Sequence, residues 1–88
     1  MTYEVLIHPQ VANNIRKLPR PQQEKIARLL NTLEFIAVPF KEFDIKKLKG
    51  QDNRYRIRLG NFRLIYEIIK GKRIIQILKL DTRKKAYK

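Results

Sequence analysis

The sequence predicts an α+β fold in which a two-helix hairpin packs on one face of a mainly antiparallel β-sheet. An N-terminal segment alternates like a strand, and two segments with apolar residues at helical spacing follow it. The second half then alternates with a period of two and is interrupted by tight turns, which makes those strands antiparallel neighbours. The 88 residues suffice for one such domain, covering 1–88 in the order β-α-α-β-β-β-β.

The first part of the chain supplies one strand and both helices. Residues 2–8 alternate as a strand, and Leu6 makes both of its faces partly apolar, so we expect this strand to lie inside the sheet. Residues 10–18 have the apolar spacing of a short helix. Pro21 fits the first turn of a second helix, whose apolar stripe runs over residues 26–37. A short proline-containing link between them predicts an antiparallel hairpin.

The remaining strands form the rest of the sheet. They are predicted at residues 45–49, 55–59, 62–69 and 73–80. The apolar stripe of the helices has nothing else to pack against, so the hairpin should cover one face of this sheet. The other face is then left to arginines that alternate with apolar residues along the second of these strands. We therefore expect an apolar inner face and a cationic outer face.

Charge is distributed unevenly and predicts the class of partner. The chain carries a formal net charge of +13, and residues 46–88 hold fifteen Lys/Arg against three Asp/Glu. A polycationic half predicts contact with nucleic-acid phosphates, and general cationic solubility is the plainer alternative. The chain has no cysteine, no apolar run long enough for a membrane span, and no signal-peptide pattern at its start. We expect a cytoplasmic protein without a membrane partner.

The candidate functional residues are mostly arginines. Arg56 and Arg58 lie two apart in one strand and share a face with Arg54, while Arg63 follows across the Gly60-Asn61 turn. Arg83 and Tyr87 stand in the basic tail. A guanidinium group stays charged and binds phosphate through two hydrogen bonds, which favours a phosphate site. The spacing is equally consistent with an exposed sheet face that simply carries long charged side chains.

Other chemistries have little support in the sequence. His8 is the single histidine, so a two-histidine ribonuclease site is impossible and a structural role is expected for it. The carboxylates are scattered, which predicts no metal site, and no cofactor motif is present. Glu67 is expected to form an ion pair with a neighbouring arginine. The tyrosines Tyr3, Tyr55 and Tyr66 are expected in the core.

Two segments carry a resemblance to a known family. Leu48-Lys49-Gly50 and the run from Tyr55 to Tyr66 (YRIRLGNFRLIY) resemble the RelE toxins of the RelE/ParE superfamily, and most closely the short archaeal ones. The resemblance implies a toxin that enters the ribosomal A site and cuts mRNA by attack of the RNA's own 2′-hydroxyl, without metal. It also implies a RelB-like antitoxin as partner and operator DNA as a ligand of the toxin–antitoxin complex.

The resemblance assigns roles to particular residues. The catalytic set carried over by motif is Arg56, Arg58, Arg63, Arg83 and Tyr87. The basic residues expected to contact RNA are Lys47, Lys49, Arg54, Lys79, Lys84, Lys85 and Lys88. Bacterial relatives often carry lysines where Arg56 and Arg58 stand, and arginine does not act as a general base. We therefore expect the arginines to act electrostatically, while the base stays open and Tyr87 either stacks on a base or relays a proton.

Two other functions are compatible with the sequence. A ParE-like inhibitor of DNA gyrase shares the fold, although such proteins usually lack the arginine set and the terminal tyrosine. A non-catalytic nucleic-acid-binding module keeps the basic sheet and cuts nothing. Replacing Arg63 by lysine separates the enzyme from the module, because a two-pronged catalytic contact is lost while simple phosphate binding is retained.

Overall fold

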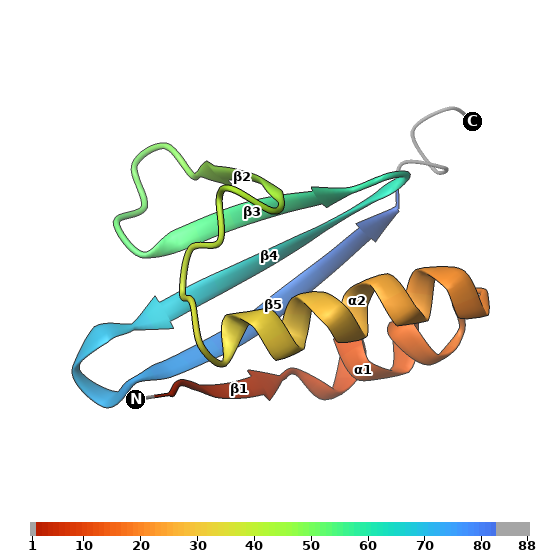
Figure 1. The fold of residues 1–88 in the computed structure, drawn as a ribbon, viewed down its shortest axis with the longest axis horizontal. Coiled ribbons are helices and arrows are strands. Elements are labelled where there is room, and N and C mark those ends of the chain that lie inside the picture. Colours follow the sequence, from red (N-terminus) through yellow and green to blue (C-terminus); the bar gives the residue numbers. More distant parts are fainter. Residues whose placement is uncertain (1, 83–88) are drawn as a thin grey trace.

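The computed structural model describes residues 2–82. Its elements follow the predicted order and are β1 (Glu4–Ile7), α1 (Pro9–Arg16), α2 (Arg20–Leu33), β2 (Asp44–Lys47), β3 (Arg54–Leu59), β4 (Phe62–Ile69), the short 3₁₀ helix η1 (Lys70–Lys72) and β5 (Ile74–Thr82). The two helices lie together on one side of the sheet (Figure 1). The predicted α+β fold class is therefore confirmed, with most boundaries shifted by one or two residues.

The five strands form one sheet in the order β1-β5-β4-β3-β2. β1 runs parallel to β5, and all the other neighbours are antiparallel. β1 is therefore an edge strand, and the prediction that it lies inside the sheet was wrong. Leu6 lies opposite Gln76 and is 40% exposed. Leu6 is apolar because the outer face of the sheet is itself partly apolar beside β5. Its apolar character does not indicate a second neighbouring strand.

The second helix ends earlier than its apolar stripe suggests. α2 stops at Leu33, and Phe35 and Ile36 in the following turn are largely exposed. The backbone carbonyl of Ala37 accepts a hydrogen bond of 2.8 Å from the Tyr66 hydroxyl. The chain leaves the helix here because it has to turn back toward the sheet before β2 begins. The prediction that the helix extends to residue 37 was therefore wrong.

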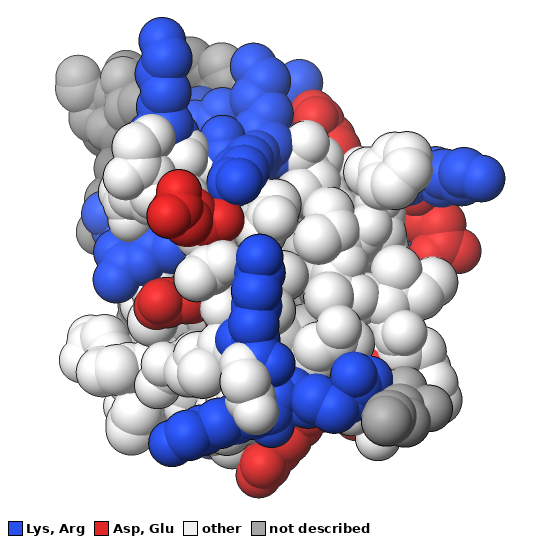
Figure 2. All heavy atoms as spheres, turned by 90° about the vertical axis from the view of Figure 1, so that its left-hand side faces the viewer, with Lys and Arg blue, Asp and Glu red and all other residues white. Residues whose placement is uncertain are grey.

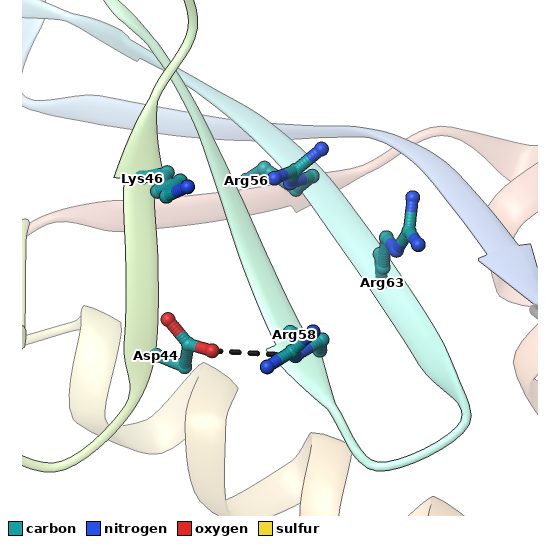
Figure 3. Close-up of a pocket in the computed structure, with 5 residues that line it drawn as sticks. All are labelled: Asp44, Lys46, Arg56, Arg58 and Arg63. Carbon is teal, nitrogen blue, oxygen red and sulfur yellow. Dashed lines mark ion pairs between the residues drawn. The ribbon is translucent and has the colours of Figure 1, made fainter.

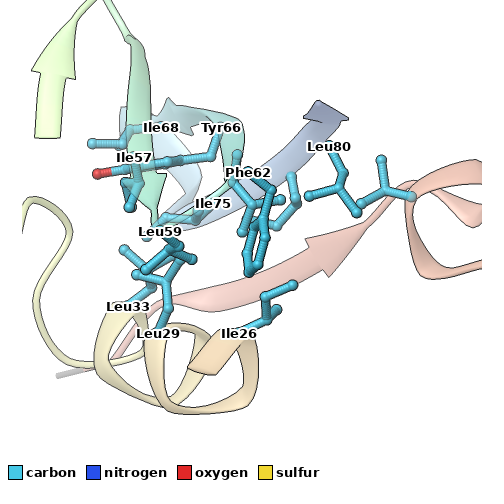
Figure 4. Close-up of a cluster of buried hydrophobic side chains, with 13 residues drawn as sticks. Ile26, Leu29, Leu33, Ile57, Leu59, Phe62, Tyr66, Ile68, Ile75 and Leu80 are labelled. Carbon is cyan, nitrogen blue, oxygen red and sulfur yellow. The ribbon is translucent and has the colours of Figure 1, made fainter. Parts of the chain in front are cut away.

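The core lies between the helices and the inner face of the sheet (Figure 4). The buried side chains come from α1, α2, β3, β4 and β5, and they are Val11, Ile26, Leu29, Leu33, Ile57, Leu59, Phe62, Leu64, Tyr66, Ile68, Ile75, Ile77 and Leu80. Burial of one such side chain contributes about 1.5–3 kcal/mol. This packing confirms that the helix hairpin covers one face, and it fixes which face of β3 and β4 points to solvent.

Several single-residue predictions are also confirmed. Tyr66 is fully buried, and its ring stacks on Tyr55 with 5.6 Å between centroids. Tyr3 packs against the same core. His8 has a structural role, because its Nδ1 accepts a hydrogen bond of 3.1 Å from the Gln10 backbone N–H and caps α1.

Neither helix of residues 2–82 is long and apolar enough to span a membrane.

The outer face is cationic only in part. Three isoleucines belong to this face, because they alternate with buried residues of β4 and β5. They are Ile65, Ile69 and Ile74, and each is half-buried. Cationic side chains concentrate instead on β2, β3 and the start of β4. The expected cationic outer face is therefore present on β2, β3 and the start of β4, and an apolar region lies beside it.

Candidate nucleic-acid interface

A pocket of about 170 Å³ opens on the outer face where β2, β3 and β4 lie side by side (Figure 3). Its lining consists of four cations and one carboxylate: Asp44, Lys46, Arg56, Arg58 and Arg63. These side chains give the lining a formal charge of +3. The predicted residues Arg56, Arg58 and Arg63 are therefore brought together in one depression.

Strand register explains why these five side chains meet. Asp44 lies opposite Arg58, which in turn lies opposite Arg63. In the next row, Lys46 lies opposite Arg56. Directly opposed residues share a face, and neighbouring strands are about 4.8 Å apart, so two such rows make a compact patch across three strands.

Only one ion pair is present among the lining residues. The Arg58 Nε and the Asp44 Oδ2 are 3.3 Å apart, and both side chains are more than half exposed. An exposed pair of this kind contributes at most about 1 kcal/mol to stability. Among the described residues, Lys46, Arg56 and Arg63 have no carboxylate within ion-pair distance. The pocket thus holds an excess of positive charge that a phosphate group can neutralise.

The other basic residues predicted to bind RNA lie around this pocket or away from it. Arg54 lies on the outer face and pairs with Glu67 at 3.6 Å, as expected for that glutamate. Lys79 lies opposite Ile65 and pairs with Asp81 at 3.6 Å. Both therefore border the pocket on the same face but are partly neutralised.

Two predicted lysines of the β2 region are not in the pocket. Lys47 lies opposite Tyr55, whose ring packs on the core, so Lys47 belongs to the other face of the edge strand. Lys49 is exposed in the turn after β2. The predicted residues Arg83, Lys84, Lys85, Tyr87 and Lys88 lie outside the described residues.

Asp44 and Lys46 are pocket residues that the sequence analysis missed. They stand two apart in a four-residue strand. The available signal was that two charged residues stand at i and i+2 on β2, the strand next to β3. Using this signal requires the register between β2 and β3 to be known. Asp44 was counted only as one of several scattered carboxylates.

Basic side chains are also exposed at the end of the molecule that holds the β4–β5 turn (Figure 1 and Figure 2). On the face seen in Figure 2, Lys and Arg side chains gather in an upper group and again along the lower edge. Lys70 and Lys72, in the β4–β5 turn, are exposed. Within residues 2–82 there is no group of three or more His, Cys, Asp or Glu residues able to hold a metal ion. The arrangement provides fixed positive charges, which bind and stabilise phosphate anions.

Comparison with known proteins identifies the family. The family described as the ParE toxin of the type II toxin-antitoxin system, parDE, matches residues 5–87. The chain belongs to this toxin family. A candidate toxin named RelE1 from Methanocaldococcus jannaschii is 41% identical to the toxin over 88 residues, covering 100% of this chain and 98% of that protein. The sequence resemblance to RelE toxins of the RelE/ParE superfamily is therefore confirmed.

Solved structures agree with this assignment. The toxin superposes on RelE of the archaeal RelE–RelB complex from Pyrococcus horikoshii OT3 with a TM-score of 0.87 and 39% identity, covering 94% of this chain and 97% of that one. It superposes on a chain of the RelB–RelE antitoxin–toxin complex from Methanococcus jannaschii with a TM-score of 0.78 and 25% identity, covering 93% and 94%. The fold of the toxin is therefore that of RelE.

Proposed function

We propose that the toxin is a ribosome-dependent mRNA endoribonuclease that cleaves in the A site by metal-independent attack of the 2′-hydroxyl. The observation that carries this proposal is the pocket formed by Lys46, Arg56, Arg58 and Arg63. A phosphodiester undergoing this attack gains negative charge on its phosphoryl oxygens, and fixed cations stabilise that charge. The activity inhibits translation and belongs in the cytoplasm, where ribosomes and mRNA meet.

Each arginine has a proposed part in the reaction. Arg63 binds the scissile phosphate through two hydrogen bonds from its guanidinium group, and Arg56 stabilises the negative charge that develops on the 2′-oxygen. Arg58 binds the same phosphate from the strand between β2 and β4. By family pattern, Arg83 acts on the leaving oxygen and Tyr87 stacks on a base or relays a proton. The basic residues Lys49, Arg54, Lys79, Lys84, Lys85 and Lys88 contact the RNA backbone, and Lys47, on the other face of the edge strand β2, is not part of this set.

The toxin is proposed to have a RelB-like antitoxin as its partner. The similar archaeal RelE proteins were solved in RelE–RelB complexes, and this toxin matches them over nearly its full length. A chain with a formal net charge of +13 favours an acidic partner by charge complementarity. Operator DNA is bound by the toxin–antitoxin complex, chiefly through the antitoxin.

The test uses ribosomes programmed with mRNA that carries a defined A-site codon. We expect primer extension to map a cut inside that codon, no cut in free mRNA, and no cut when the codon's nucleotides are 2′-deoxy. Arg63→Lys should lower the cleavage rate about 100-fold or more, because a point charge replaces two directed hydrogen bonds. Arg28→Lys makes the same change at an exposed position of α2 and should leave the cleavage rate unchanged.

A second candidate function follows from the family description, which names ParE. A gyrase inhibitor would block DNA supercoiling by gyrase in vitro and leave A-site mRNA intact. A toxin that binds ribosomes or RNA without doing either would be a nucleic-acid-binding module. Parallel ribosome and gyrase assays on one folded preparation therefore distinguish the three functions.

A further inference from the structure

Within residues 2–82, the lining of the basic pocket includes one anionic side chain. Of its five lining side chains, only Asp44 carries a carboxylate. Attack by a 2′-hydroxyl requires a group that removes its proton, and such a general base contributes about 10²–10⁴-fold to a rate. An arginine guanidinium keeps its proton at any working pH, and a lysine ammonium group has three hydrogen-bond donors and no acceptor. The four cations of the pocket therefore leave this task unassigned.

We propose that Asp44 is the general base that accepts the 2′-hydroxyl proton, an inference that rests on the proposed ribonuclease function. Asp44 stands at the end of a row that continues through Arg58 and Arg63 on the two neighbouring strands. The row sets the acceptor beside the Arg58 guanidinium, and Arg58 lies in turn beside Arg63. The order across the sheet is therefore fixed: the base Asp44 on β2, then the phosphate-binding residues Arg58 on β3 and Arg63 on β4.

The contact between Asp44 and Arg58 supports this order. The Arg58 Nε approaches the Asp44 Oδ2 at 3.3 Å (Figure 3). A guanidinium has five N–H donors, so its two terminal nitrogens remain free for phosphate oxygens. The carboxylate and the phosphate then share one guanidinium. An attacking oxygen has to lie about 3–3.5 Å from phosphorus and within about 3 Å of its base, and a site between the two anions meets both requirements.

The charges that face Asp44 come from every strand of the pocket. Lys46 lies on its own strand, Arg56 and Arg58 on β3, and Arg63 on β4. In the resting state these four cations outweigh the single carboxylate, and the lining carries a formal charge of +3. Once the proton has moved to Asp44, they balance the negative charge that has passed to the pentacoordinate phosphorus. The charge inside the pocket is therefore conserved during proton transfer.

The step balances in atoms and electrons. The 2′-hydroxyl proton passes to an Asp44 carboxylate oxygen while the 2′-oxygen forms a bond to phosphorus. The bond between phosphorus and the 5′-oxygen breaks, and the leaving oxygen takes a proton from water. Asp44 then releases its proton to solvent. The products are a 2′,3′-cyclic phosphate and a 5′-hydroxyl, and nothing is oxidised or reduced.

The test separates chemistry from binding with Asp44→Asn, whose amide oxygen still accepts a hydrogen bond from Arg58. We expect single-turnover cleavage on programmed ribosomes to fall about 100-fold or more. Affinity for ribosomes carrying the non-cleavable 2′-deoxy codon should stay equal or become tighter, because a negative charge near the phosphate has been removed. Asp44→Glu should cleave faster than Asp44→Asn. Asp52→Asn, the same change in the exposed β2–β3 turn, should alter neither quantity.

Three outcomes would overturn the assignment. If Asp44→Asn cleaves as fast as the wild type or faster, Asp44 acts only as an electrostatic brake on phosphate binding. If cleavage and affinity fall in parallel, Asp44 only positions Arg58. A wild type that leaves A-site mRNA intact removes the ribonuclease function and the base together. Asp44→Ser, a second variant on this exposed edge strand, should show the same separation of rate from affinity.

Discussion

Replacing Tyr66 by phenylalanine tests how the sheet holds the chain that leaves α2. Tyr66 is fully buried, and its hydroxyl donates a hydrogen bond of 2.8 Å to the carbonyl of Ala37. Phenylalanine keeps the ring and its stacking on Tyr55, whose centroid is 5.6 Å away. The substitution therefore removes one hydrogen bond and leaves the hydrophobic packing in place.

The expected cost follows from that bond and its surroundings. Loss of a hydrogen bond that leaves a buried partner unsatisfied costs about 1–3 kcal/mol, and an ordinary bond costs about 0.5–1.5 kcal/mol. Ala37 is half-buried, so water can partly replace the lost donor. We expect a loss of about 1–1.5 kcal/mol in the free energy of unfolding. For a domain of this size, each kcal/mol lowers Tm by about 4–8 °C.

The same residue predicts a pH dependence. Burial raises the pKa of Tyr66 well above its usual value, followed by a smaller effect of Tyr55. Because the folded-state pKa is raised, the stability contributed by the neutral hydroxyl is complete below about pH 10, the unfolded-state pKa, and declines above it. The advantage of the wild type over Tyr66→Phe should therefore shrink as pH rises past 10.

The assay is urea denaturation followed by circular dichroism at pH 7 and at pH 10.5, on both proteins. Tyr3→Phe is the matched control, because within the described residues the Tyr3 hydroxyl makes no hydrogen bond. It should change the free energy of unfolding by less than about 0.5 kcal/mol. A Tyr66→Phe effect no larger than this control at pH 7, or one that stays constant up to pH 10.5, would refute the reasoning.

The remaining predictions concern the core, a turn and the pocket. Leu29→Ala should cost about 2–5 kcal/mol in urea denaturation, because Leu29 is fully buried. Gly60→Ala should cost about 1 kcal/mol, because its φ is +62°, and Gly71→Ala, with no positive φ and nothing within 4 Å of its Cβ position, should be nearly neutral. Lys46→Gln should make the negative slope of log affinity for single-stranded RNA against log salt concentration shallower by about 0.7, as measured by fluorescence anisotropy. An unchanged slope would place Lys46 away from the phosphates.

Local patterns were sufficient to predict the elements. The period of two in β3 and the helical spacing in α2 depend only on neighbouring residues, and the structure confirms both. The edge position of β1 and the early end of α2 were not predicted. Both depend on contacts between distant segments: the pairing of β1 with β5 and the bond from Tyr66 to Ala37. Such contacts leave no periodic trace in the sequence.

The pocket shows the same division. Arg56, Arg58 and Arg63 were predicted together because two lie at i, i+2 and the third follows a tight turn. Asp44 was not recognised, and Lys47 was assigned to RNA contact although it lies opposite Tyr55 on the other face. A shift of one residue in the register of β2 would exchange these two faces. Register is set by the turn and by core packing, which the strand's own four residues do not specify.

Alternation, helical spacing and charge are properties of neighbouring residues, so the sequence alone was enough to predict a basic α+β domain. The resemblance to RelE toxins rested separately on Leu48-Lys49-Gly50 and on the run from Tyr55 to Tyr66. The folded chain was needed to place Asp44 beside Arg58 and to bring Lys46 into the pocket with Arg56 and Arg63. These placements arise from strand pairing, in which the burial of Ile57, Leu64 and their neighbours fixes one register and turns the charged row outward.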